Sequence, residues 1–194
     1  MLIIRHRINS SAELAITPKS MGVEVDLRSR NDQIILEHEP FKPGEIFEDW
    51  LTGWDHQTLV LNIKEEGLEK RVTDTLEKLR INDYFFLDQS FPFMQKLIKQ
   101  GNTRVAARAS DIESVETPLA SGASWCWLDS FSGDWAYLSS AVPRLTSAKI
   151  RTCLVSPELQ RSDSNAELRN LQSFIHGSGL QIDAVCTKKP ELWK

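Results

Sequence analysis

Two acidic residues, Glu24 and Asp26, lie two positions apart in the otherwise apolar stretch from Gly22 to Leu27. Alternate side chains of an extended strand point to the same face, so both carboxylates share one face, and Val23, Val25 and Leu27 share the other. Burying two carboxylates is unfavourable unless a cation or hydrogen-bond donors neutralise them. A divalent cation with oxygen ligands would do this. The spacing therefore indicates a metal site.

Two histidines accompany this pair, and each comes at the end of a strand-like run. His6 follows the apolar residues that begin at Leu2, and His38 follows Ile34-Ile35-Leu36. The unperturbed pKa of histidine is near neutrality, which suits it both to accept and to donate a proton. Together with the carboxylates, the histidines indicate a metal site with its own acid and base.

Length and composition favour one domain, residues 1–194, with a substantial core. The net charge is -4 with mixed signs throughout, so no basic surface predicts nucleic-acid binding. No apolar run approaches the roughly 20 residues of a transmembrane segment, and the opening residues lack signal-peptide features. The three cysteines lie in apolar runs, which favours reduced, buried thiols. These features predict a cytoplasmic protein.

Eight strand-like runs alternate with helical patterns along the chain. The strands are predicted over residues 2–7, 23–27, 58–64, 84–87, 104–109, 124–128, 150–155 and 182–187, with 33–36 included in the second β/α segment. Helices are predicted after a cap at Asn9-Ser10-Ser11 and over residues 46–54, 68–81, 92–100, 137–145 and 166–175, with a helical turn over 111–116.

Strict alternation of apolar strands and helices predicts a parallel sheet covered by helices. Eight units favour a compact (β/α)8 TIM barrel over an open doubly wound sheet, and no nucleotide-binding glycine motif is present. Polar residues gather at or just past the strand carboxyl ends, the catalytic face of TIM barrels. They are His6, Glu24, Asp26, His38, Asn62, Lys64, Asp88, Ser90, Arg108, Asp129 and Glu158.

Structural interpretations of the same residues stay open. A histidine at a strand end is more often a hydrogen-bonded structural group. The carboxylate pair could form a solvated strand edge, or ion pairs with Arg5, Arg28 or Lys64. A barrel interior has no free edge to solvate two carboxylates, which favours the metal site.

Read in order, these segments resemble the glycerophosphodiester phosphodiesterase family of the phospholipase-C-like phosphodiesterase barrels. That family has a His-Arg after strand one, a Glu-x-Asp on strand two and a His-Asp shortly afterwards. The corresponding segments here are His6-Arg7, Glu24-Val-Asp26 and His38-Glu39. Asn62-Ile-Lys64, Ser90-Phe91 and the segment from Thr187 to Pro190 resemble later motifs, so the resemblance spans the whole chain.

The resemblance implies a role for each matched residue. It implies an acid/base pair, His6 and His38, two metal ligands, Glu24 and Asp26, and two phosphate-binding cations, Arg7 and Lys64. Asn62 stands where the family's third metal-binding carboxylate is expected. Its amide oxygen can ligate Mg²⁺ or Ca²⁺ without adding charge. Three further residues are placed either to line the pocket or to cap loops: Arg108, Asp129 and Glu158.

We therefore expect a metal-dependent hydrolase that acts on a phosphodiester of a small alcohol or lipid headgroup, within lipid metabolism. One alternative is a catalytically degenerate barrel that binds a phosphorylated or sugar ligand. Another is a metal-dependent barrel enzyme whose substrate is not a phosphate, such as a sugar acid.

Overall fold

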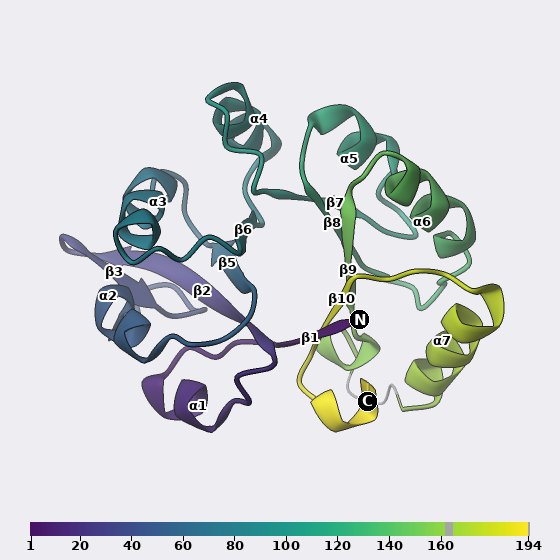
Figure 1. Ribbon diagram of the computed structural model, residues 1–194, viewed down its shortest axis with the longest axis horizontal. Coiled ribbons are helices and arrows are strands. Elements are labelled where there is room, and N and C mark those ends of the chain that lie inside the picture. The colour runs from purple at the N-terminus through teal and green to yellow at the C-terminus, as the bar shows by residue number, and fades with distance from the viewer. Residues whose placement is uncertain (162–164, 194) are drawn as a thin grey trace. The chain divides into compact units, whose positions relative to one another are not determined.

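A computed structural model describes residues 1–161 and 165–193. The chain divides into two compact units. One unit is Ile4–Gln100, and the other combines Met1–Ile3 with Gly101–Lys194. Figure 1 labels their helices and strands.

The first unit, Ile4–Gln100, contains four parallel strands that are neighbours in chain order. They are β1 (Leu2–Arg5), of which only the last two residues belong to this unit, β2 (Gly22–Arg30), β5 (Leu59–Ile63) and β6 (Tyr84–Leu87). The register places Arg5 opposite Val23, Asp26 opposite Asn62, and Asn62 opposite Leu87. The strand carboxyl ends of this unit therefore lie at one edge, where the predicted site residues occur.

An antiparallel extension is attached to β2. The chain turns at Asn31, which has φ 54°, and returns as β3 (Gln33–Leu36), with Leu27 opposite Leu36. The short β4 (Glu45–Ile46) then pairs with β3. This hairpin brings the chain back toward the carboxylates of β2.

The helices of this unit begin and end where their residues predict. Ser10 caps α1 and Ser90 caps α4, each accepting a main-chain N–H with its hydroxyl. Val72 and Leu76 are the buried apolar residues of α3. The bounds are α1 (Ser11–Ile16), α2 (Phe47–Trp50), η1 (Leu51–Gly53), α3 (Glu69–Lys78) and α4 (Phe91–Lys99).

The second unit, Met1–Ile3 with Gly101–Lys194, repeats the same plan. Its parallel strands pair in chain order: β7 (Ala106–Ala109), β8 (Trp125–Leu128), β9 (Arg151–Val155) and β10 (Ala184–Thr187). Figure 1 shows α5, α6 and α7 along the same side of these strands. The helices are α5 (Glu116–Ser121), α6 (Leu138–Ser147), η2 (Pro157–Leu159), α7 (Asn165–Ser178) and η3 (Pro190–Trp193).

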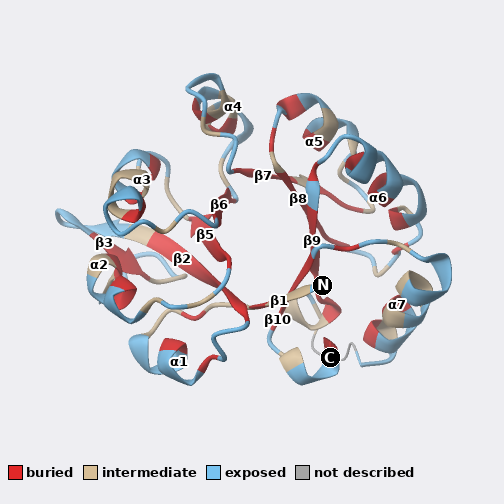
Figure 2. Cartoon of the chain, in the orientation of Figure 1, coloured by how far each residue is buried: buried red, intermediate tan, exposed pale blue. Residues whose placement is uncertain are grey.

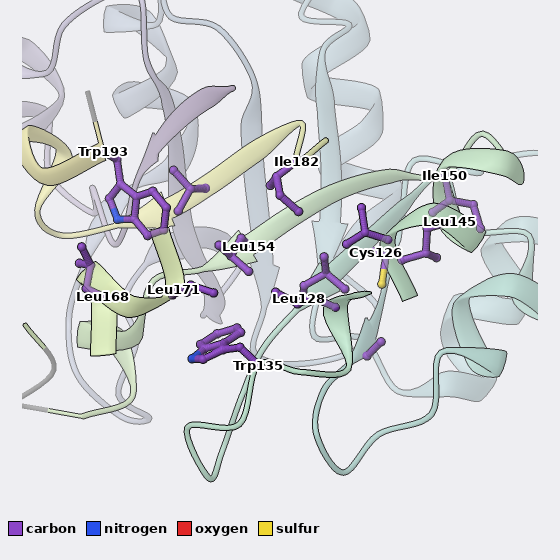
Figure 3. Close-up of a cluster of buried hydrophobic side chains, with 14 residues drawn as sticks. Cys126, Leu128, Trp135, Leu145, Ile150, Leu154, Leu168, Leu171, Ile182 and Trp193 are labelled. Atoms are coloured by element: carbon purple, nitrogen blue, oxygen red, sulfur yellow. The ribbon is translucent and has the colours of Figure 1, made fainter. Parts of the chain in front are cut away.

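The core of the second unit lies between its strands and its helices. Figure 3 shows Cys126, Leu128 and Leu154 from the strands facing Leu145 and Leu171 from the helices. In Figure 2 the strands are almost entirely buried, while each helix exposes its outer face. Fully buried strands explain why the sequence shows continuous apolar runs rather than alternation.

In the described residues, eight parallel strands are each followed by an α-helix or, after β10, a 3-10 helix, which confirms the predicted (β/α)8 pattern. The three cysteines are buried thiols, as predicted. The predicted helical turn over residues 111–116 is wrong, because α5 begins only at Glu116. The Asp111 carboxylate instead accepts the main-chain N–H groups of Phe131 and Ser132. Among the described residues, no helix combines the length and apolar character needed to cross a bilayer.

Candidate functional site

The carboxylates of Glu24 and Asp26 are buried on the same face of β2. β2 lies between β1 and β5, and both acidic side chains are fully shielded from solvent. Carboxylates in this position need charged or hydrogen-bonding partners to remain in the folded state. The groups that supply this compensation define the candidate site.

Both oxygens of Glu24 accept hydrogen bonds. The main-chain N–H of Arg7 donates to Oε2 at 2.7 Å, and the Asn62 amide donates to Oε1 at 3.0 Å. His6 Nε2 lies 3.8 Å from Oε2. Burial, followed by the negative charge of Asp26, raises the pKa of Glu24 from 4.5 to about 7, although the two hydrogen bonds lower it. Glu24 therefore titrates near neutrality.

This shifted pKa should make the protein less stable as the pH rises from 4.5 to about 7 without divalent cations. The pKa of Glu24 is higher in the folded protein than its ordinary value. Its contribution to the free energy of unfolding is therefore fully present below pH 4.5 and is lost above about pH 7. The difference corresponds to on the order of 3 kcal/mol. Glu24→Gln should therefore remove most of the decline, measured by urea unfolding in EDTA at about pH 5 and about pH 8.

The control for this experiment is Glu77→Gln, which removes the same charge from an exposed position on α3. It should leave the pH dependence of the free energy of unfolding intact. A decline of equal size in wild-type protein and Glu24→Gln would contradict the assignment.

Asp26 is held by three side chains. Lys64 Nζ lies 3.0 Å from Oδ1, and the Asn9 amide donates to Oδ2 at 2.8 Å. Arg7 Nε lies 3.7 Å from the same Oδ2. The ion pair with Lys64 is one of the structural interpretations that the sequence left open, and it is compatible with a role in binding phosphate. Asn9 is a site residue that the sequence prediction missed.

The chain leaves β1 by an unusual turn. Arg7 has φ 54°, in the left-handed region that residues other than glycine rarely adopt. In this turn the main-chain N–H of Arg7 meets the Glu24 carboxylate, and the next N–H, of Ile8, donates to the Glu24 carbonyl at 2.9 Å. Such backbone conformations cluster at functional sites, where surrounding contacts hold them in place. The predicted strand 2–7 consequently ends at Arg5.

His38 follows the β2–β3 hairpin. The N–H of Glu37 donates to the Asp26 carbonyl at 3.1 Å, which places His38 one residue beyond this contact. Arg28 donates two hydrogen bonds, at 2.9 and 3.1 Å, to the His38 carbonyl. The ring Nδ1 lies 2.7 Å from Glu39 Oε1, and this hydrogen bond lowers the pKa of Glu39. Glu39 thus orients the His38 ring.

The other three predicted residues lie in the second unit. Arg108 donates to Asp129 Oδ2 at 2.9 Å, and Gln160 donates to the same oxygen at 2.8 Å. Burial raises the pKa of Asp129, against the effect of Arg108. Glu158 accepts hydrogen bonds from the Ser156 and Thr187 hydroxyls. Glu158 therefore caps the loop after β9, the second of the roles that the sequence left open.

The carboxylate pair on β2 and Asn62 near the carboxyl end of β5, opposite Asp26 in the register, supply oxygen ligands. The Asn62 amide nitrogen donates to Glu24, while its Oδ1 is buried and has no hydrogen-bond partner among the described residues. In residues 1–161 and 165–193, no three His, Cys, Asp or Glu side chains form a cluster that could hold a metal. Two carboxylates and an amide oxygen are nevertheless ligands that Mg²⁺ and Ca²⁺ accept, so these three residues fit a hard divalent cation.

No protein-family model and no curated protein sequence matches this chain. Solved structures do. A glycerophosphodiester phosphodiesterase from Thermotoga maritima has a TM-score of 0.67 and 15% identity, covering 100% of this chain and 96% of its own. A glycerophosphoryl diester phosphodiesterase from Parabacteroides distasonis has a TM-score of 0.70 and 13% identity, covering 98% of this chain and 84% of its own. A glycerophosphodiester phosphodiesterase from the same organism has a TM-score of 0.66 and 13% identity, covering 98% and 93%.

These similarities extend over nearly the whole length of both chains, at identities where only the fold is shown. They confirm the predicted compact (β/α)8 TIM-barrel architecture, and the resemblance seen in the sequence motifs holds at the level of structure. The chain has the fold of the glycerophosphodiester phosphodiesterases.

Proposed function

We propose that this protein is a metal-dependent hydrolase of phosphodiesters that carry a small alcohol or a lipid headgroup. The observation that carries the proposal is the gathering of acidic, basic and imidazole groups around one buried carboxylate pair. His6 and Asn62 contact Glu24, Lys64 contacts Asp26, and Arg7 contacts both. The fold of the solved phosphodiesterases supports the same reaction class.

The carboxylate pair and the Asn62 amide oxygen would hold the cation. When bound, Mg²⁺ or Ca²⁺ supplies positive charge beside a non-bridging phosphate oxygen. The side chains of Lys64 and Arg7 are 15% and 38% exposed. Their charged groups would therefore be accessible to a phosphate. Arginine binds phosphate oxygens in pairs, and lysine binds them as a point charge.

The two histidines would transfer the protons. One accepts a proton from water, or from a neighbouring substrate hydroxyl, as the oxygen attacks phosphorus. The other donates a proton to the alcohol oxygen as its bond to phosphorus breaks. His6 lies against Glu24 and His38 against Glu39, so each imidazole has a neighbouring carboxylate that can orient its ring.

The proposed function is tested by hydrolysis of bis-p-nitrophenyl phosphate and of glycerophosphodiesters. Purified protein should release product with Mg²⁺, Ca²⁺ or Mn²⁺ and lose this activity in EDTA. Glu24→Gln should be inactive with every metal, whereas Glu77→Gln should keep wild-type rates. Turnover that persists in EDTA, or in Glu24→Gln, would rule out the metal-dependent mechanism.

A binding protein without catalysis is the second candidate. The specific observation in its favour is that Lys64 and Arg7 already contact Asp26, while Asn62 adds no negative charge for a metal. Such a protein would bind a phosphorylated or sugar ligand equally well in EDTA. Calorimetric titration with a non-hydrolysed phosphate monoester, with and without metal, separates the two candidates.

A further inference from the structure

Asn9 is tied to Asp26 by two hydrogen bonds in opposite directions. Its amide nitrogen donates to the Asp26 carboxylate at 2.8 Å, and its Oδ1 accepts the main-chain N–H of Asp26 at 2.9 Å. One side chain thus bridges the backbone and the carboxylate of the same residue. An amide side chain supplies a donor and an acceptor on separate atoms of one planar group, so it can make both contacts at once.

The need for this contact follows from the length of β1. β1 pairs with β2 only at Ile4 and Arg5, and the chain then turns away at Arg7. Asp26 lies further along β2 than β1 reaches, so its N–H has no β1 carbonyl opposite it. The Asn9 side chain supplies the missing acceptor and continues the sheet pairing beyond the end of the strand.

The second hydrogen bond acts on the carboxylate. Asn9 contacts Oδ2, and Lys64 contacts Oδ1, so the two oxygens are held from different elements. A carboxylate has about four lone-pair positions, so both oxygens keep acceptor capacity for a cation or substrate. With its donors fixed in this way, the carboxylate cannot rotate freely within the site.

We propose that Asn9 is a positioning residue that sets the orientation of the Asp26 carboxylate for cation binding and turnover. This inference rests on the proposed function. Asn9 itself is not a ligand; it acts through Asp26. Removing a hydrogen-bonding partner of a metal-ligating carboxylate commonly lowers metal affinity or activity by about 10–100-fold.

Mn²⁺ alone is the probe for the first test. Asn9→Ala should weaken Mn²⁺ binding, measured by calorimetric titration, by about 10-fold or more. It should lower kcat while leaving KM for bis-p-nitrophenyl phosphate nearly unchanged, because Asn9 does not touch the substrate. The exposed Asn82, which donates to the Arg80 carbonyl, is the control, and Asn82→Ala should match wild type. Wild-type Mn²⁺ affinity and kcat in Asn9→Ala would overturn the inference.

Asn9→Asp separates positioning from structural support. This variant keeps an acceptor for the Asp26 N–H but replaces the donor to the carboxylate by a second negative charge. A role limited to accepting the Asp26 main-chain N–H would be preserved, and kcat would then return to the wild-type value. Positioning of the carboxylate predicts instead that kcat stays as low as in Asn9→Ala. Full rescue by aspartate would therefore overturn the proposal.

Failure of the proposed function has a different signature. The unaltered protein would then bind no Mn²⁺ and hydrolyse no diester. The contribution of the contact between Asn9 and Asp26 to stability can still be measured in EDTA, by the midpoint of thermal unfolding. Both Asn9 variants should lower the midpoint by several degrees, and Asn9→Asp should lower it more because like charges then face each other. Unchanged midpoints in both variants would overturn the contact itself.

Discussion

His6→Ala should lower kcat/KM for a phosphodiester by about 10²–10⁴-fold, the usual contribution of a positioned acid or base. His6 follows β1, and its Nε2 lies 3.8 Å from a fully buried carboxylate oxygen of Glu24. Removing the imidazole removes the proposed proton carrier while leaving the carboxylate pair and its hydrogen bonds from Arg7 and Asn62 in place. His38→Ala should show a loss of similar size for the opposite proton transfer. Initial rates at saturating Mn²⁺ measure both effects.

His176→Ala is the matched control, because His176 lies exposed in the last turn of α7. It should retain the wild-type rate. Circular dichroism and urea unfolding must show that the His6 and His38 variants remain folded at the assay temperature. Activity within about tenfold of wild type in either folded variant would remove that histidine from the acid/base pair.

The strands were predictable because each is buried on both faces. Every residue of Leu59–Ile63, Tyr84–Leu87 and Trp125–Leu128 is buried, and these runs are apolar except for Asn62. Parallel sheets are buried on both faces, so neither face of a strand requires polar residues. The apolar strand runs, together with the helical patterns between them, therefore predict most of this architecture.

One local feature depends on contacts between residues that are far apart in the sequence. Asp111 was predicted to start a helical turn, yet its carboxylate accepts N–H groups some 20 residues away in the loop after β8. Burial alone would raise the pKa of Asp111. Hydrogen bonds from the Ser132 hydroxyl and from the main-chain N–H groups of Phe131 and Ser132 outweigh it and lower this pKa to about 2. Nothing near Asp111 in the sequence indicates those partners.

The candidate site shows the same division. Glu24 and Asp26 were recognisable because acidic residues in a buried strand demand an explanation. Asn9 was not recognisable, because an asparagine beside two serines before a helix is typical of a helix cap. Ser10, within the predicted Asn9-Ser10-Ser11 cap, is the residue that caps the helix. Only the register of the loop after β1 against β2 shows that the Asn9 amide faces Asp26.

Lys64→Met should lower the free energy of unfolding by about 3 kcal/mol in EDTA, at the lower end of the range for breaking a buried ion pair. Lys64 Nζ lies 3.0 Å from Asp26 Oδ1, with 15% of the lysine side chain and none of the aspartate exposed. Removing the cation leaves a buried carboxylate whose remaining contacts are Asn9 and the more distant Arg7. For a chain of this size the midpoint of thermal unfolding should fall by about 6–12 °C.

Lys70→Met provides the comparison at an exposed site. Lys70 lies 2.7 Å from Asp74, a shorter distance than in the buried pair, but 85% of its side chain is exposed. Exposed pairs of this spacing contribute only about 0.3–0.5 kcal/mol, so burial rather than distance should decide the effect. Equal losses in the two lysine variants would show that the contact between Lys64 and Asp26 contributes no more than a surface pair.

A second substitution tests whether the loss arises from the unpaired charge. Asp26→Asn combined with Lys64→Met should recover most of the lost stability, because no unpaired buried carboxylate then remains at Asp26. Mn²⁺ gives an independent test, since a cation held by Glu24 and Asp26 replaces the missing positive charge. Its stabilising effect should therefore be larger in Lys64→Met than in wild type, and absent from the double variant. Stabilisation of the double variant by Mn²⁺ would show that the cation binds elsewhere.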